Sequence, residues 1–228
     1  MLKNILKYLV HIYIYIYIFA QFLTFNTQTY MKKLLILIVS MFVSLSMNIW
    51  AEQIVGSFEN TYFGKNFTIE AYQENNKLKK VYIEVLAKDS KSAFICVSGD
   101  DLELFNTSLE LVRDKFLSWV KIAKDNNVTE MNKEFDIKFP SVSVSWYGSK
   151  WWFAFYQELK MSFLILDDGR MLALWIPKVA SSSNEYIDET IYFVFETEED
   201  FNSLIKQLNP QGILNQLLNT QNKAELFQ

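Results

Sequence analysis

Residues 67–97 have the sequence FTIEAYQENNKLKKVYIEVLAKDSKSAFICV, which contains three runs of alternating apolar and polar side chains. A period of two is typical of a β-strand with one buried face. Short polar breaks separate the runs, and their length is typical of hairpin loops. The stretch therefore predicts an antiparallel meander. Its three strands are expected at residues 67–72, 81–86 and 93–97.

The period changes in the segment that follows, where apolar residues recur at steps of three and four and Trp119 widens the stripe. This spacing predicts one apolar face of a long helix over residues 102–124. Thr107 and Glu110 have the spacing of a capping box, with Asp100 or Asp101 as alternative caps of an earlier turn. The expected buried face consists of Phe105, Leu109, Val112, Phe116, Val120 and Ala123.

Strand patterns resume after this helix. The segment 167–170, Asp-Asp-Gly-Arg, lies between two apolar runs and predicts a tight hairpin, because Asp and Gly tolerate the positive φ of such turns. Thr197 precedes three acidic residues and predicts the start of a C-terminal helix, which Pro210 interrupts. Further strands are expected at residues 135–139, 142–146, 151–157, 161–166, 171–176 and 189–195.

This order of elements predicts the α+β class. Antiparallel sheets of short hairpin-connected strands are expected to be covered by one long amphipathic helix and a C-terminal helix. An apolar leader precedes them. The domain organisation we expect is a signal peptide at residues 31–51 followed by one globular domain at residues 52–228.

The signal peptide hypothesis depends on the order of residues after Met31. Two lysines are followed by an apolar stretch shorter than the roughly 20 residues of a membrane-spanning helix, and then by Ala51 at the expected cleavage site. An exported protein of the periplasm, cell surface or exterior is expected. No cysteine follows the apolar stretch, so a bacterial lipid anchor has no attachment point.

Residues 1–30 need a separate explanation, because a signal peptide does not normally begin inside a chain. Ile and Tyr alternate over residues 12–18, as they would if an alternating A/T dinucleotide repeat were translated. We therefore expect Met1 to be a misassigned start and Met31 the true one. The alternative is a first membrane helix within residues 1–30 and a second after it, which would anchor the protein through residues 5–50.

Composition excludes several function classes. All 26 acidic residues and 18 of the 22 basic residues follow Ala51, which gives this part a net charge of −8 and argues against nucleic-acid binding. The lone histidine, His11, lies in the leader, and Cys96 is the only cysteine. Histidine catalysis, a zinc site and an internal disulfide are therefore not expected, nor is a cofactor, since nucleotide-binding glycine motifs are absent. Cys96 is expected to be buried in its strand.

Carboxylate catalysis needs no histidine, so a hydrolase acting on glycans is one alternative function. The acidic candidates are each expected to have structural roles in caps, turns or strand ends. They are Asp100, Asp101, Glu103, Asp167, Asp168, Asp188 and Glu189.

Seven aromatic residues occupy eleven positions between Trp146 and Tyr156. Strand alternation places Trp152 and Tyr156 on one face, and we expect these two to contact a ligand if that face is exposed. The other face, with Trp151, Phe153 and Phe155, is expected to be core. The function we expect is a non-catalytic binding module of the cell envelope or exterior, with a protein or glycan partner; a membrane-anchored envelope protein is a further alternative.

The leader hypothesis makes a prediction about the native protein. Mass spectrometry of the protein isolated from its source should give a mature N-terminus at or near Glu52, because the signal peptidase removes residues up to Ala51. Detection of any peptide from residues 1–30 would contradict the misassigned start and favour the membrane anchor.

Overall fold

The computed structural model describes residues 52–225, and the expected signal peptide and upstream segment lie outside this range. Within it, no helix is long and apolar enough to cross a membrane. The described chain contains eleven strands and three helices, which confirms the α+β class. The elements in chain order are β1 Gln53–Asn60, β2 Lys65–Glu74, β3 Lys77–Ala87, β4 Ala93–Ser98, α3 Leu102–Asp125, β5 Met131–Glu134, β6 Val142–Tyr147, β7 Trp151–Gln157, β8 Ser162–Ile165, β9 Met171–Trp175, β10 Lys178–Ser181, β11 Asn184–Phe195, α4 Glu198–Gln207 and α5 Pro210–Glu225.

Strand β3 joins the two halves of the sheet. Along one edge it pairs with β4, and along the other it pairs first with β2 and then, at Leu86 and Ala87, with β11. One half of the sheet is the meander β1-β2-β3-β4-β6-β7, and the other is β5-β8-β9-β11 with β10 attached to β11. Every strand pair in the described part of the chain is antiparallel, as expected from the short loops.

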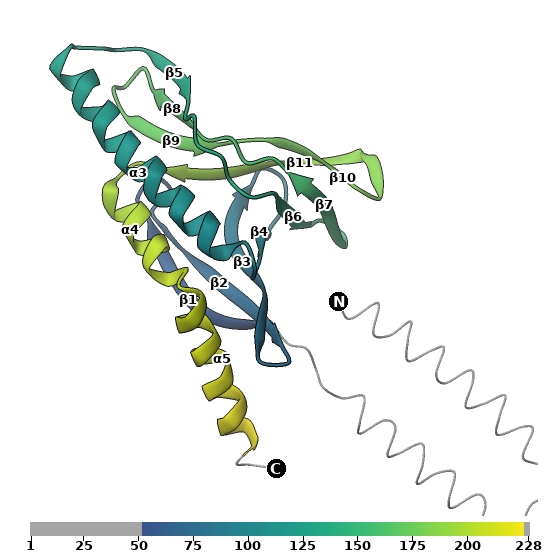
Figure 1. Cartoon of the computed structure of the whole chain (residues 1–228). Helices are drawn as coiled ribbons and strands as arrows, with labels where there is room; N and C mark the ends of the chain where they lie inside the picture. Colours follow the sequence, from purple (N-terminus) through teal and green to yellow (C-terminus); the bar gives the residue numbers. More distant parts are fainter. Residues whose placement is uncertain (1–51, 226–228) are drawn as a thin grey trace, which may run out of the picture. The chain divides into compact units, whose positions relative to one another are not determined.

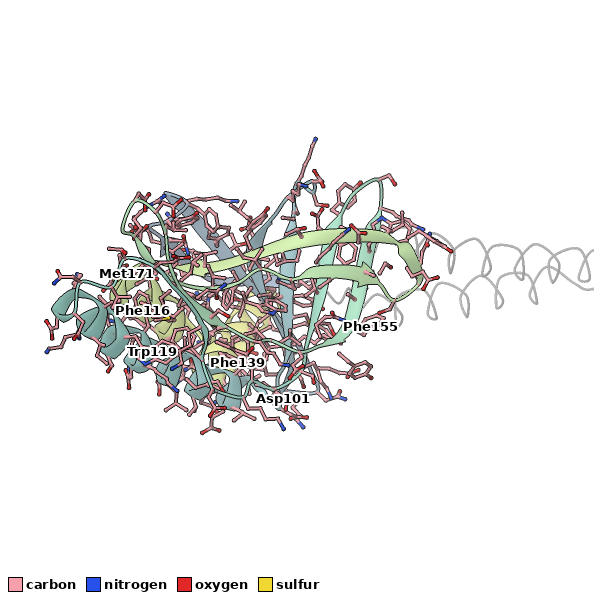
Figure 2. The ribbon with its side chains drawn as sticks, turned by 90° about the horizontal axis from the view of Figure 1, so that it is seen from above. Asp101, Phe116, Trp119, Phe139, Phe155 and Met171 are labelled. Carbon is pink, nitrogen blue, oxygen red and sulfur yellow. The ribbon has the colours of Figure 1, made fainter. Side chains whose placement is uncertain are left out.

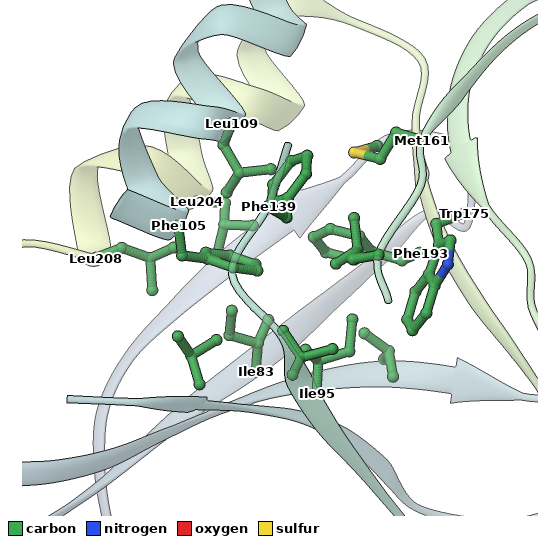
Figure 3. Close-up of a cluster of buried hydrophobic side chains, with 14 of the residues drawn as sticks. Ile83, Ile95, Phe105, Leu109, Phe139, Met161, Trp175, Phe193, Leu204 and Leu208 are labelled. Atoms are coloured by element: carbon green, nitrogen blue, oxygen red, sulfur yellow. The ribbon is translucent and has the colours of Figure 1, made fainter. Parts of the chain in front are cut away.

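The helices lie on one side of the sheet (Figure 1). The predicted apolar stripe of α3 is confirmed, because Phe105, Leu109, Val112 and Phe116 are at most 2% exposed. Phe116 touches Phe163 of β8 and Phe201 of α4, with ring centroids 5.9 and 5.7 Å apart. Ile83 and Ile95 of the sheet lie opposite the helix side chains in the same core (Figure 3).

Several turns and caps follow the sequence pattern. Asn75 and Asn76 connect β2 to β3 with φ of 52° and 57°, the values that a two-residue hairpin of type I′ requires. Gly169 has a φ of 82° in the predicted β8–β9 hairpin. Thr197 caps α4 in a capping box with Asp200, as expected from its position before the acidic run.

Two local predictions are wrong. Residues 135–139 do not form a strand: Phe135 and Phe139 alternate with exposed residues, but they pack against α3, with Phe139 and Phe105 centroids 5.5 Å apart. The apolar residues of this segment alternate because they pack on α3, and within the described residues the segment has no hydrogen-bonded neighbouring strand. The capping box of Thr107 and Glu110 is also wrong, since α3 begins at Leu102. Asp101 occupies the cap position without a side-chain hydrogen bond to the helix.

The central position of Phe116 predicts a large stability effect. Phe116→Ala should lower the free energy of unfolding by about 3 to 5 kcal/mol, because it leaves a cavity between α3, α4 and β8. Leu111→Ala is the matched control, since Leu111 lies on the same helix but is 53% exposed. Chemical denaturation of both variants measures the difference, and equal stability of the two would contradict the assignment of the buried face.

Candidate functional site

One face of β3, β4, β6 and β7 is turned away from the core. Ile95 of β4, Val144 of β6 and Ala154 of β7 are fully buried on the inner face of the sheet. Because side chains alternate along a strand, the residues directly before and after each of them face outward. Strand register places Phe94 beside Ser145 and Ser145 beside Phe153 in one row across this outer face. The region is therefore an open sheet surface with aromatic side chains on adjacent strands.

We call this surface the aromatic face and define it as Phe94, Tyr147, Trp151, Phe153 and Phe155. The ring of Trp151 contacts Phe94 and Tyr147, with centroids 6.0 and 5.4 Å apart. Phe153 and Phe155 stack with an interplanar angle of 10°. Tyr147, Phe153 and Phe155 are 41%, 44% and 50% exposed, and Figure 2 shows Phe155 at one end of the domain.

This arrangement corrects the predicted faces of β7. Phe153 and Phe155 are exposed instead of buried, whereas Trp152 is half-buried against the core, with the Lys150 ammonium 4.0 Å from its ring centroid. Both sets of alternating residues are aromatic, so hydrophobicity did not rank the two faces. The small residue Ala154 was the informative signal, because it lies on the same face as Trp152 and is fully buried.

Trp152 and Tyr156, the predicted contact residues, do not share a regular strand face. Val142 pairs with Gln157 and Val144 with Ala154, so three steps along β7 match two along β6. The extra residue makes a β-bulge, and Tyr156 has a φ of 56° there with 88% of its surface exposed. A ligand contact by Tyr156 or Trp152 stays a prediction, but the two side chains do not form the expected pair on one face.

The outer edge of β7 is held by the β10–β11 turn. The Ser182 N–H donates to the Phe153 carbonyl oxygen at 2.8 Å, and the Phe155 N–H donates to the Ser182 hydroxyl at 3.0 Å. These bonds connect β7 back to the β10–β11 hairpin, which is paired with β3 through β11. The two exposed phenyl rings are therefore on a backbone that is fixed along both edges.

An acidic group flanks the aromatic face on β1 to β3. Burial, followed by the charges of Glu52 and Glu84, raises the pKa of Glu70. Glu84 accepts hydrogen bonds from the Thr68 N–H and hydroxyl, both at 2.9 Å, and forms an ion pair with Lys65 at 3.3 Å. The outer sheet surface thus has an acidic end and an aromatic end.

Four of the seven acidic residues considered from the sequence have structural partners: Asp100, Asp168, Asp188, which forms an ion pair with Lys178 at 3.0 Å, and Glu189. Asp100 forms an exposed ion pair with Lys77, which lowers its pKa, and Asp168 does the same with Arg170 in the β8–β9 turn. Glu189 is 3% exposed and accepts bonds from Asp89, Ser90 and Thr190, which fixes the β3–β4 loop. Within residues 52–225, no group of three His, Cys, Asp or Glu side chains is arranged to hold a metal ion.

Comparison with known proteins identifies no relative: neither a protein family, nor a curated protein, nor a solved structure matches this chain. The candidate site therefore depends on the geometry of the aromatic face alone.

Cys96 lies on the outward side of β4, two residues from Phe94, and is 9% exposed, in agreement with the expected burial. Burial raises the pKa of its thiol to about 11 from 9.0. Burial also raises the pKa of Tyr82, the residue paired with Cys96 on β3. Both groups are therefore neutral at physiological pH.

These raised pKa values predict the pH dependence of stability. The neutral thiol contributes fully below about pH 9, where it is protonated in both states, and its contribution is lost as the pH rises toward 11, because the unfolded chain ionises first. Denaturation of the wild type should therefore show a steeper loss of stability between these pH values than Cys96→Ala, in which Tyr72 and Tyr82, whose pKa values are also raised, still titrate in this way. Parallel curves for the two proteins would contradict the burial of the thiol.

Proposed function

We propose that this protein is an exported, non-catalytic binding module that holds an apolar segment of a protein partner on its aromatic face. The observation that carries the proposal is the stacked, exposed pair Phe153 and Phe155. A phenyl ring has no polar atom to hydrogen-bond with water, so exposing two adjacent rings to solvent is unfavourable unless a partner covers them. Aromatic residues are enriched at the centres of protein interfaces.

The rigidity of β7 supports a binding role. The Ser182 hydrogen bonds and the β6 ladder fix the backbone beneath both rings, so little conformational entropy is lost when a partner binds. The bulge at Tyr156 interrupts the alternation of β7 directly after Phe155, so the two stacked rings are the last regular outward residues of this strand.

A protein segment fits the surface better than a glycan. Phe153 and Phe155 offer apolar contact without hydrogen bonds for sugar hydroxyls, whereas aliphatic and aromatic side chains need only such contact. The acidic group Glu52, Glu70 and Glu84 lies on the same surface, with Glu84 in the row of Phe94 and Phe153. We therefore infer a partner segment with apolar residues at Phe153 and a basic residue at Glu84. These two positions are separated by three strand spacings, or roughly 14 Å.

The leader supports the location. Two lysines, a short apolar stretch and a small residue, Ala51, at the cleavage site follow the pattern of an export signal, which supports a location in the periplasm, at the cell surface or outside the cell. The membrane-anchored alternative through residues 5–50 would hold the same face near a membrane instead.

A carboxylate-based hydrolase is the second candidate function. Its specific support is the pair of carboxylates Glu70 and Glu84: burial raises the pKa of Glu70, and Glu84 accepts two hydrogen bonds from Thr68 and forms an ion pair with Lys65. Two carboxyl groups in different environments are the arrangement that glycoside hydrolysis uses.

Peptide selection tests the proposed function. Random dodecapeptides displayed on phage should yield apolar sequences with a basic residue, and the double variant Phe153→Ala/Phe155→Ala should bind them at least about tenfold more weakly. Its melting temperature should stay within about 2 °C of the wild type, because both rings are half-exposed. Leu104→Ala/Leu111→Ala is the matched control, since these α3 residues are 54% and 53% exposed but lie in the helix layer.

The other results are informative as well. Equal loss of binding in both double variants would show nonspecific hydrophobic adsorption and contradict the proposal. Cleavage of an oligosaccharide that Glu70→Gln abolishes would favour the hydrolase, and binding of glycans without binding of peptides would assign the aromatic face to a sugar.

A further inference from the structure

A pocket of about 220 Å³ lies at the opposite end of the domain from the aromatic face, between the last turns of α3 and strands β5 and β8. Figure 2 shows Trp119 of this region and Phe155 of the aromatic face at opposite ends. Most of the lining is apolar, and Ile122 and Met131 remain 54% and 37% exposed at the surface. The pocket lining includes Trp119, Ala123, Val128, Phe163 and Ile165.

Two lysine side chains lie near the indole of Trp119, and one of them, Lys133, also lines the pocket. The Lys115 and Lys133 ammonium nitrogens are 5.3 and 5.0 Å from its ring centroid, within the range of cation–π contact. Phe135 stacks on the same indole at 4.9 Å with an interplanar angle of 13°. Among residues 52–225, neither ammonium forms an ion pair with a carboxylate.

The neighbouring acidic groups are directed elsewhere. Asp125, near the end of α3, forms an ion pair with Lys121 at 2.9 Å. Glu134 follows Lys133 on β5, so strand alternation places it on the other face, where its charge contributes to the raised pKa of Lys160. Two positive charges thus lie at the Trp119 indole beside the apolar pocket, although residues 52–228 as a whole have a net charge of −8.

The pocket has a charged end and an apolar end. Lys133 pairs in register with Phe163 at the charged end, and Met131 pairs with Ile165 at the apolar end. The lining therefore changes from charged to apolar along β5 from Lys133 to Met131. The helix follows the same direction, because Lys115 and Trp119 precede Ala123, whose carbonyl oxygen accepts the Val128 N–H. The distance from Lys115 to Ala123 along α3 is about 12 Å, given a rise of 1.5 Å per residue.

We propose that this pocket binds a medium-chain carboxylate, with the anionic head at Lys115 and Lys133 and the acyl chain directed along α3 toward Val128. A pocket of this size is smaller than the roughly 300 to 1,000 Å³ that holds a drug-sized molecule, so it suits a single short chain. The site is separate from the aromatic face and does not depend on the function proposed for it.

Titration of the purified protein with octanoate below its micelle concentration tests the site, with heat and tryptophan fluorescence as readouts. Octanoate should bind with saturation, while octanol, octyltrimethylammonium and acetate should bind at least several-fold more weakly, because each lacks the charge or the chain. Lys133→Met should lower the affinity roughly threefold to tenfold, the size expected for one partly exposed charge contact, and Lys133→Arg should restore most of it.

Lys91→Met is the matched control, because Lys91 is an exposed lysine of the β3–β4 loop that forms no ion pair within the described residues. The affinity of this variant for octanoate should equal that of the wild type. Ile122→Trp, which fills the mouth of the pocket from an exposed position, should abolish saturation. Octanol binding as tightly as octanoate, an unchanged affinity of Lys133→Met, or no saturable binding by the wild type would each overturn the proposal.

Discussion

The pairing of β3 with three other strands is the constraint on which the architecture depends. Its first part, from Lys77 to Ile83, pairs with β2, its middle part, from Lys80 to Val85, pairs with β4, and its last two residues pair with β11. Val81, Ile83 and Val85 alternate on the buried side and fix which face of both halves is turned to the helices. A shift of one residue in β3 would therefore reverse the buried and exposed faces of the meander and remove the aromatic face from solvent.

The sequence predicted those parts of the fold that depend on local patterns. The 3.6-residue period of α3, the cap at Thr197 and the turn at Gly169 each depend on a few neighbouring residues, and all three are present in the structure. Prediction failed where the same alternating pattern fits more than one structure. Residues 135–139 alternate because every second side chain meets α3, and β7 is aromatic on both sides, so only packing decides that Ala154 faces inward. The pocket at Trp119 combines α3, β5 and β8, which no local pattern brings together.

Buried polar groups connect elements that are distant in sequence. Asp200 is 1% exposed and accepts hydrogen bonds from the N–H groups of Thr61, Glu196 and Thr197, so a single carboxylate joins the β1–β2 turn to the start of α4. The Asn60 amide donates to the Val194 carbonyl oxygen at 2.6 Å beside it. Burial of a carboxylate without these donors would cost free energy, so the hydrogen bonds of Asp200 stabilise one specific arrangement of the β1–β2 turn and α4. The residues of the aromatic face and the lining of the Trp119 pocket take no part in these hydrogen bonds.

The hydrogen bond between Asp200 and the Thr61 N–H spans 139 residues of chain. At the usual synthesis rate of about 5 to 20 residues per second, the ribosome needs roughly 7 to 28 seconds to advance from one partner to the other. During that interval β1 and β2 can form their ladder, but the turn between them has no acceptor and the inner face has no α4. Contacts this distant along the chain also make folding slow once synthesis is complete. The fold is therefore completed by its C-terminal helices, and the inner face of β1 and β2 stays uncovered until α4 has been synthesised.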